Sequence, residues 1–181
     1  MMKLKLLSYN MLNGFCGDNP PFVVDTKRMR AGMKILHQAK ADVVGLQEAF
    51  IYPFAEHTTA YTPFFTKLYL SQYIPPTYFR WGPVTLSRYS CTFRDVSTEQ
   101  CKCLETVVRV GKKKLVVWNV HLHHAIADEL RAVSVQALLL ASKPDVILGD
   151  FNGGSLEDRY DLKQLLTGFS RFMKQGARTK V

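Results

Sequence analysis

The chain has 181 residues, 47% of them hydrophobic and 12% aromatic, with 24 Lys and Arg against 15 Asp and Glu. This length and composition predict a single globular domain over residues 1–181, and they exclude a disordered, fibrous or collagen-like chain. The formal net charge of +9 favours a polyanionic partner, either nucleic acid or an anionic phospholipid surface, because a basic protein attracts polyanions over a long range.

The cysteines and the amino terminus indicate the compartment. Four cysteines are too few for a secreted disulfide scaffold and lack the two-pair spacing of a zinc site, so we expect reduced thiols at Cys16, Cys91, Cys101 and Cys103. No stretch reaches the roughly 20 apolar residues of a transmembrane helix, and the start of the chain lacks the apolar segment of a signal peptide. These features predict an intracellular protein, cytoplasmic or nuclear.

The first half of the chain is predicted to form two strands around one helix. Alternating apolar residues predict a strand over 4–11, and helical spacing predicts a helix from Asp25 or Thr26 to about Lys40. A short apolar run over 42–48 is typical of a strand buried on both faces. The following residues, 51–79, are irregular and rich in aromatics and proline, so we expect a loop with a short helix around 62–72.

The next segment is predicted to contain a hairpin. Apolar runs predict strands over 84–88 and 104–110. Gly111-Lys-Lys-Lys114 is typical of a turn, which would join the second of these strands to another over 115–121. Cys101 and Cys103 are spaced to lie on one face of a strand, where we expect them to be buried as small hydrophobic residues.

The last third is predicted to add a helix, a strand and a second helix. Apolar residues at steps of four and three predict a helix over 125–142, with its buried face formed by Ile126, Leu130, Val133, Ala137 and Leu140. A strand over 145–149 follows Pro144, and Ser155 with Asp158 favours a final helix that reaches about Thr167. The alternation of strands and helices indicates a mixed α/β fold.

Four of the predicted strands end in polar residues that are suited to catalysis. These residues are Asn10, Glu48, His121, Asp150 and Asn152. Each also has an ordinary structural interpretation, such as a turn-forming asparagine, a strand-end glutamate or a hydrogen-bonded buried histidine. Their recurrence at strand ends favours a shared site.

Five short motifs resemble the endonuclease/exonuclease/phosphatase superfamily of metal-dependent phosphoesterases, which includes DNase I, abasic-site endonucleases, deadenylases and neutral sphingomyelinases. In chain order they are Ser8-Tyr9-Asn10, Gln47-Glu48, Leu86-Ser87-Arg88-Tyr89, Asn119-Val120-His121-Leu122 and Gly149-Asp150-Phe151-Asn152. The resemblance implies a DNase I-like four-layer sandwich of two β-sheets flanked by helices. One departure is that the family normally closes with a Ser-Asp-His segment, whereas no histidine follows His124 here. We therefore expect a domain that is incomplete at its C-terminus.

The resemblance also implies a role for each site residue. Glu48 would be the ligand of Mg²⁺, with Mn²⁺ as the alternative, and Asn10 would support the metal and the catalytic aspartate. His121 would contact the scissile phosphate, where a cationic imidazole suits the developing charge. Asp150 would act as the general base or orient the water, and Asn152 would help to fix that nucleophile.

The sequence thus predicts a Mg²⁺-dependent hydrolase of phosphodiesters, with nucleic acid as the leading substrate class because of the charge. A sphingomyelin-type phospholipid is the second substrate. The alternative function is that of a truncated, catalytically impaired relative that binds polyanions or a protein. A third interpretation is that the missing strands lie in another segment or chain, which would leave an exposed apolar sheet edge.

Overall fold

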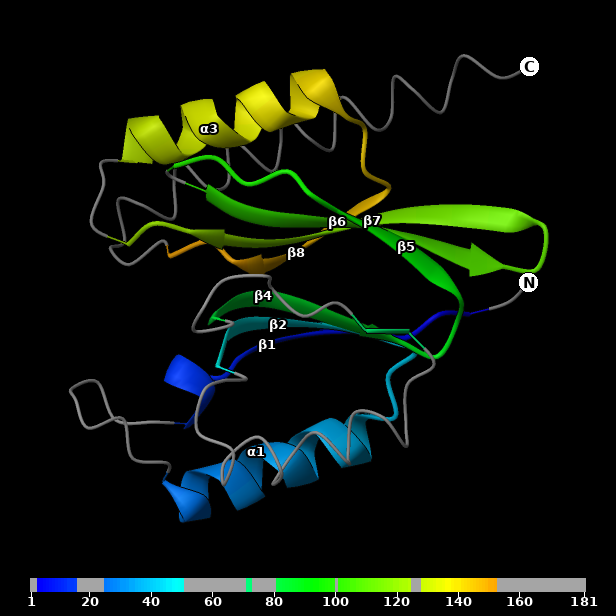
Figure 1. The fold of residues 1–181 in the computed structure, drawn as a ribbon, viewed down its shortest axis with the longest axis vertical. Coiled ribbons are helices and arrows are strands. Elements are labelled where there is room, and N and C mark those ends of the chain that lie inside the picture. Colours follow the sequence, from blue (N-terminus) through cyan, green and yellow to red (C-terminus); the bar gives the residue numbers. More distant parts are fainter. Residues whose placement is uncertain are drawn as a thin grey trace.

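Two β-sheets stack face to face, and a helix covers the outer face of each (Figure 1). This arrangement is seen in a computed structural model, which describes residues 3–15, 25–50, 71–72, 81–99, 101–124 and 128–152. None of the described helices is long and apolar enough to cross a membrane.

The first sheet has the strand order β1-β2-β4-β3. Strand β1 (Leu6–Asn10) runs parallel to β2 (Val43–Phe50), and the crossover between them contains helix α1 (Thr26–Ala39). Strand β4 (Trp81–Ser87) is antiparallel to β2, and β3 (Ser71–Gln72) pairs with the other edge of β4. Residues 71 and 72 are therefore strand, and not the end of the predicted short helix. The other residues of that prediction lie outside the described part of the chain.

The ends of α1 explain why the helix begins and stops where it does. The carboxylate of Asp25 accepts hydrogen bonds from the backbone N–H groups of Lys27 and Arg28, at 2.9 and 3.0 Å, and so caps the first turn. Lys40 ends the helix in the left-handed conformation. A short 3₁₀ turn, η1 (Asn13–Phe15), separates β1 from the residues that lead to this helix.

The second sheet has the strand order β5-β6-β7-β8. Strands β5 (Cys91–Asp95), β6 (Cys101–Val110) and β7 (Lys113–Leu122) are antiparallel neighbours. Strand β8 (Val146–Asp150) is parallel to β7, and helix α3 (Asp128–Ala141) belongs to the crossover between them. The sequence did not predict β5, because its apolar alternation is too short to stand out.

Three apolar clusters fill the spaces between these layers. The cluster between the sheets contains Val43, Val108, Val117 and Leu148, all with exposed fractions of 9% or less. A second cluster lies between the first sheet and α1, and a third lies between the second sheet and α3. The third includes Cys101 and Cys103, which are fully buried as predicted.

The buried face of α3 differs from the predicted one. Val133 and Leu140 are 59% and 89% exposed, whereas Val135 and Leu138 pack against the second sheet. The reason is that apolar residues occur around most of this helix, so the sequence is compatible with more than one inward face. Ile126 and Leu130 lie where no side chain is described, as does the predicted final helix.

Candidate active site

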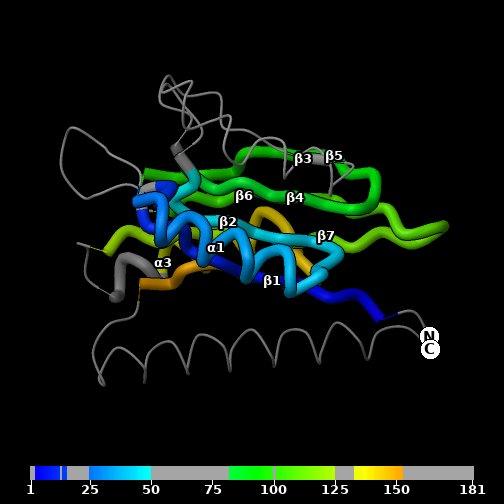
Figure 2. Tube along the Cα trace, turned by 90° about the horizontal axis from the view of Figure 1, so that it is seen from below, coloured from blue at the N-terminus to red at the C-terminus, as the bar shows by residue number. Residues whose placement is uncertain are grey.

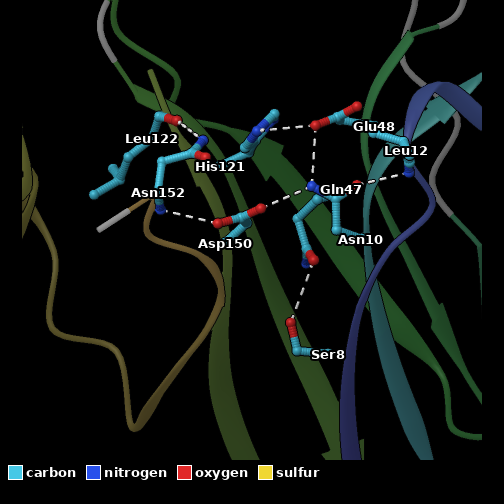
Figure 3. A network of polar contacts seen from close by, with 9 residues as sticks. All are labelled: Ser8, Asn10, Leu12, Gln47, Glu48, His121, Leu122, Asp150 and Asn152. Carbon is cyan, nitrogen blue, oxygen red and sulfur yellow. Dashed lines mark hydrogen bonds and ion pairs between the residues drawn. The ribbon is translucent and has the colours of Figure 1, made fainter. Parts of the chain in front are cut away.

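The carboxyl ends of the two parallel strand pairs meet between the sheets and bring the predicted site residues together (Figure 3). Strands β1 and β2 contribute from one sheet, and β7 and β8 contribute from the other. The residues brought together at this end are Asn10, Glu48, His121, Asp150 and Asn152. All five sequence candidates therefore lie in one cluster.

Asn10 links two carboxylates that come from different sheets. Its Nδ2 donates to Glu48 Oε1 at 3.0 Å and to Asp150 Oδ2 at 2.7 Å. Its Oδ1 accepts from the backbone N–H of Leu12 at 2.7 Å, which fixes the orientation of the amide. The amide nitrogen, and not the oxygen, therefore faces the carboxylates. In this geometry Asn10 supports a metal by orienting two acids, and is not itself an oxygen ligand.

A bulge in β2 aims Glu48 into the site. The pairing of β2 with β4 shifts between Leu46 and Ala49, so two residues of β2 face the single residue Pro83, which has no N–H to donate. Glu48 adopts φ 51°, a left-handed conformation that costs a non-glycine residue about 1 kcal/mol. Its side chain keeps 16% of its surface exposed, so solvent or a ligand can reach the carboxylate.

A fully buried asparagine ties this bulge to the second sheet. Asn119 Nδ2 donates to the carbonyls of Leu46 and Val84, both at 3.0 Å, and its Oδ1 accepts from Gln47 Nε2 at 2.6 Å. Gln47 Oε1 in turn accepts from the Ser8 hydroxyl at 3.3 Å. These contacts satisfy carbonyls beside the bulge, and they fix β7, which carries His121, relative to Glu48. The sequence placed Asn119 and Gln47 in family motifs but gave no sign of this positioning role.

His121 lies on the inner face of β7, directly opposite Asp150 in the register with β8. Its Nε2 is 3.5 Å from Glu48 Oε1. Burial lowers the pKa of the imidazole, and the nearby carboxylates of Glu48 and Asp150, which raise it, do not compensate fully. The direction of this shift is toward the neutral imidazole, whereas we expected a cationic form from the sequence.

Asp150 and Asn152 form a tight turn at the end of β8. Asp150 Oδ1 accepts from the backbone N–H of Asn152 at 2.9 Å, and Asn152 Nδ2 donates to the carbonyl of Leu122 at 2.6 Å. Asn152 thereby joins the end of β8 to the end of β7 and holds the Asp150 carboxylate in place. Gly149 is required just before them, since it has φ 147° and a Cβ there would lie 2.0 Å from the Val120 carbonyl oxygen.

The donor set fits a hard divalent cation. Two carboxylates converge on one neutral amide, which concentrates negative charge at a partly exposed point. Among the described residues no group of three or more His, Cys, Asp and Glu side chains is placed to hold a metal. Mg²⁺ does not require one, because it usually takes one or two protein carboxylates and keeps several waters. Glu48 and Asp150 are the side chains that would face such an ion.

Several solved structures have a similar fold. One is the β-hairpin deletion mutant of β toxin from Staphylococcus aureus, with 19% identity, a TM-score of 0.64 and coverage of 90% of this chain and 72% of that one. Sphingomyelinase C from Streptomyces griseocarneus has 19% identity, a TM-score of 0.63 and coverage of 90% and 70%. Truncated TDP2 from Caenorhabditis elegans has 17% identity, a TM-score of 0.58 and coverage of 86% and 64%.

The chain thus spans about two thirds of the length of these structures. The likeness confirms the DNase I-like sandwich that the sequence motifs implied. No curated protein sequence matches the chain. The sequence model of the Endonuclease/Exonuclease/phosphatase family matches residues 7–177, and members of that family are phosphoester hydrolases that generally use divalent metals. The chain belongs to the endonuclease/exonuclease/phosphatase family.

Proposed function

We propose that the chain hydrolyses a phosphodiester in nucleic acid with the help of Mg²⁺. One observation carries this proposal: carboxylates from two sheets share the Asn10 amide, and His121 approaches the same point from β7. Such a cluster can hold a cation and a phosphoryl group side by side. Mn²⁺ is the alternative ion, because it also accepts carboxylate oxygens.

Each side chain has a task in this reaction. A bound Mg²⁺ would supply charge neutralisation at the phosphoryl oxygens. Asp150, fixed by Asn10 and by the backbone of Asn152, accepts a proton from the attacking water at one of its carboxylate oxygens. The water oxygen bonds to phosphorus as the ester P–O bond breaks, and the departing oxygen takes a proton from solvent. His121 donates a hydrogen bond to a phosphate oxygen and stabilises charge that develops there.

The net charge and the similar structures bear on the substrate. A charge of +9 favours a polyanion, and nucleic acid is the leading polyanion among the substrates of the proposed reaction. One similar structure, TDP2 from D. rerio, was solved with a single-strand DNA product, and another, ANGEL2, is a 2',3'-cyclic phosphatase. A sphingomyelin-type phospholipid is the second substrate that we propose, because a sphingomyelinase shares the fold.

An impaired relative is the rival function. The 181 residues contain no histidine after His124. A protein that lacked the closing histidine of the family would lack one member of a cooperating catalytic set, and such a loss can lower the rate by orders of magnitude. Such a protein would bind polyanions or a protein partner without turnover. The same fold and the same carboxylate cluster would serve that role, so activity must be measured directly.

The test is metal-dependent hydrolysis of bis-p-nitrophenyl phosphate, single-stranded DNA and sphingomyelin vesicles. We expect activity with Mg²⁺ that EDTA abolishes and that Glu48→Ala and His121→Ala each reduce at least about a hundredfold. His37→Ala is the matched control, because this exposed histidine lies on α1 away from the site. No activity in the parent on any of the three substrates would support the rival, and activity that both site variants retain would refute the assigned site.

A further inference from the structure

Exposed cations gather at the end of the molecule opposite the candidate site. The β6–β7 hairpin carries four of them, and the segment that leads into β1 lies at the same end in both views (Figures 1 and 2). We call this group the basic end, and it consists of Lys3, Lys5, Arg109, Lys112, Lys113 and Lys114. All six side chains are exposed. Within the described part of the chain no carboxylate is paired with any of them.

We propose that the basic end is a nucleic-acid-binding surface that holds a polynucleotide while a distant phosphodiester of the same strand occupies the site. This inference rests on the proposed function, since it takes nucleic acid as the substrate. The acids at this end do not cancel its charge locally. Asp42 accepts a hydrogen bond from the backbone N–H of Lys5, and Asp145 accepts one from the backbone N–H of Val116. These two acids are fewer than the six cations of the basic end.

The hairpin is built with like charges facing each other. Arg109 of β6 lies directly opposite Lys114 of β7, and two further lysines follow in the turn and at the start of β7. Like charges on directly opposed residues of an antiparallel pair destabilise it. A row of phosphates beside these side chains would reduce the repulsion between them, so an anionic polymer would stabilise the hairpin when it binds.

The composition of the turn favours nucleic acid over a membrane. Peripheral membrane contacts combine basic residues with large apolar or aromatic ones that enter the acyl boundary. The exposed large apolar residues in the described part of the chain are Leu12, Ile35, Val133 and Leu140, and none belongs to the hairpin. A membrane docked on the basic end would also lie at the opposite end of the molecule from the site, where its lipids could not reach Glu48.

A polynucleotide, in contrast, can reach both places. His121 lies eight residue steps after Lys113 in β7, a distance of about 26 Å along an extended strand. In a double helix the phosphates of one strand follow one another at about 3.4 Å along the axis, so about eight nucleotides in helical geometry, or fewer in an extended single strand, cover this length. The basic end would therefore raise the affinity for long substrates.

The experiment measures binding of a fluorescein-labelled 30-nucleotide single strand by anisotropy, in EDTA so that no turnover is required. The test variant combines Lys112→Gln, Lys113→Gln and Lys114→Gln. The matched control combines Lys27→Gln, Arg30→Gln and Lys34→Gln, which removes the same charge from exposed positions of α1. We expect the hairpin variant to lose affinity at least tenfold and the control less than threefold. A plot of log affinity against log salt concentration has a negative slope. In the hairpin variant this slope should become less steep by about 2, because each of the three lost phosphate contacts contributes about 0.7.

Three outcomes would overturn the inference. The first is unchanged affinity in the hairpin variant, and the second is an equal loss in the α1 control, which would show an effect of net charge alone. The third is that the hairpin lysines are needed to sediment with phosphatidylserine vesicles but not to bind the 30-mer, which would assign the surface to lipid. The melting temperature of the hairpin variant should equal or exceed that of the parent, which excludes misfolding. Failure of the proposed function is distinguishable, because a parent that binds through the hairpin but hydrolyses no nucleic acid leaves the surface intact.

Discussion

Each of the two faces of the second sheet carries an acidic residue at the centre of a hydrogen-bonded cluster, and the two clusters are built differently. On the face toward α3, the Glu105 carboxylate accepts from Arg94, Trp118 Nε1 and the Ser142 hydroxyl, at 2.5 to 3.1 Å. On the inner face, the Asp150 carboxylate shares the neutral Asn10 amide with Glu48 of the other sheet. The first cluster includes a guanidinium, whereas the second places two acids beside one amide.

Under the proposed function, the difference separates a structural acid from a functional one. Burial by itself raises the pKa of Glu105, but the hydrogen bonds from Ser142 and Trp118 and the charge of Arg94 outweigh it and lower the pKa below its ordinary value. The charge of Glu105 is thus matched inside the protein. At the site the donor is the uncharged amide of Asn10, and the pKa of the nearby His121 is lowered. A bound cation would therefore balance the negative charge of the two carboxylates.

The largest expected effect is on activity, from Glu48→Gln. This variant keeps the shape of the side chain but removes the charge that would hold Mg²⁺. We expect kcat/KM on bis-p-nitrophenyl phosphate to fall about a thousandfold, equivalent to about 4 kcal/mol. Thermal unfolding should show that the added metal raises the Tm of the parent but not that of the variant.

The same substitution also tests the contrast between the clusters. In the absence of metal, Glu48→Gln should leave the free energy of unfolding unchanged or raise it, because it removes one of two acids that face each other. A clear loss of stability would show that Glu48 is a structural acid like Glu105. Asp95→Asn is a suitable control, since Asp95 is an exposed acid on β5.

The second effect is on stability, from Glu105→Gln. The glutamine amide has one accepting oxygen in place of two, and its NH2 group can only donate, so Arg94, Trp118 and Ser142 cannot all keep their hydrogen bonds and the charge that they share is lost. We expect the free energy of unfolding, measured by urea denaturation, to fall by about 2 kcal/mol while the kcat is retained. Arg94→Gln should cost about 0.5 kcal/mol, because its side chain is 61% exposed and solvent screens the pair. An equal loss in both variants would contradict the importance of Trp118 and Ser142.

The contrast between the clusters also shows how far the sequence was informative. Asn10, Glu48, His121, Asp150 and Asn152 could be predicted to converge, because each follows an apolar strand and the ends of parallel strands meet at one edge. The sequence could not show that Asn10 turns its nitrogen toward the carboxylates, since that depends on the N–H of Leu12. The roles themselves stay predictions.

Residues that act across the sheets were harder to recognise. Asn119 interrupts an otherwise apolar strand, but its partners are carbonyls of Leu46 and Val84, which become available only where β2 bulges. Glu105 sits in a strand predicted from its apolar neighbours, and its donors come from β5, β7 and the end of α3. Pairings between distant segments of this kind are fixed by tertiary structure, and local patterns do not contain them.

The third effect is a dependence of stability on pH that the α3-side cluster should show through Glu105. The folded-state pKa of Glu105 lies below its ordinary value of 4.5, so its stabilising contribution is complete above that pH and disappears as the pH falls through the folded-state pKa. We expect the stability difference between the parent and Glu105→Gln to be largest at neutral pH and to shrink below pH 4.5. Urea titrations from pH 7 downward measure it. A constant difference would show that the ionised form of Glu105 is not the stabilising one.

The smallest effect concerns access to the two faces. Cys101 and Cys103 lie in the same α3-side core as Trp118, and burial raises the pKa of the Cys101 thiol to about 12 and raises that of Cys103 as well. Since the thiolate is the reactive form, neither should react with iodoacetamide at pH 8 in the folded protein. The partly exposed Cys91 provides an internal comparison, read by peptide mass mapping. Labelling of the buried pair at the rate of Cys91 would mean that the α3-side face opens to solvent, and that Glu105 is no more enclosed than the site.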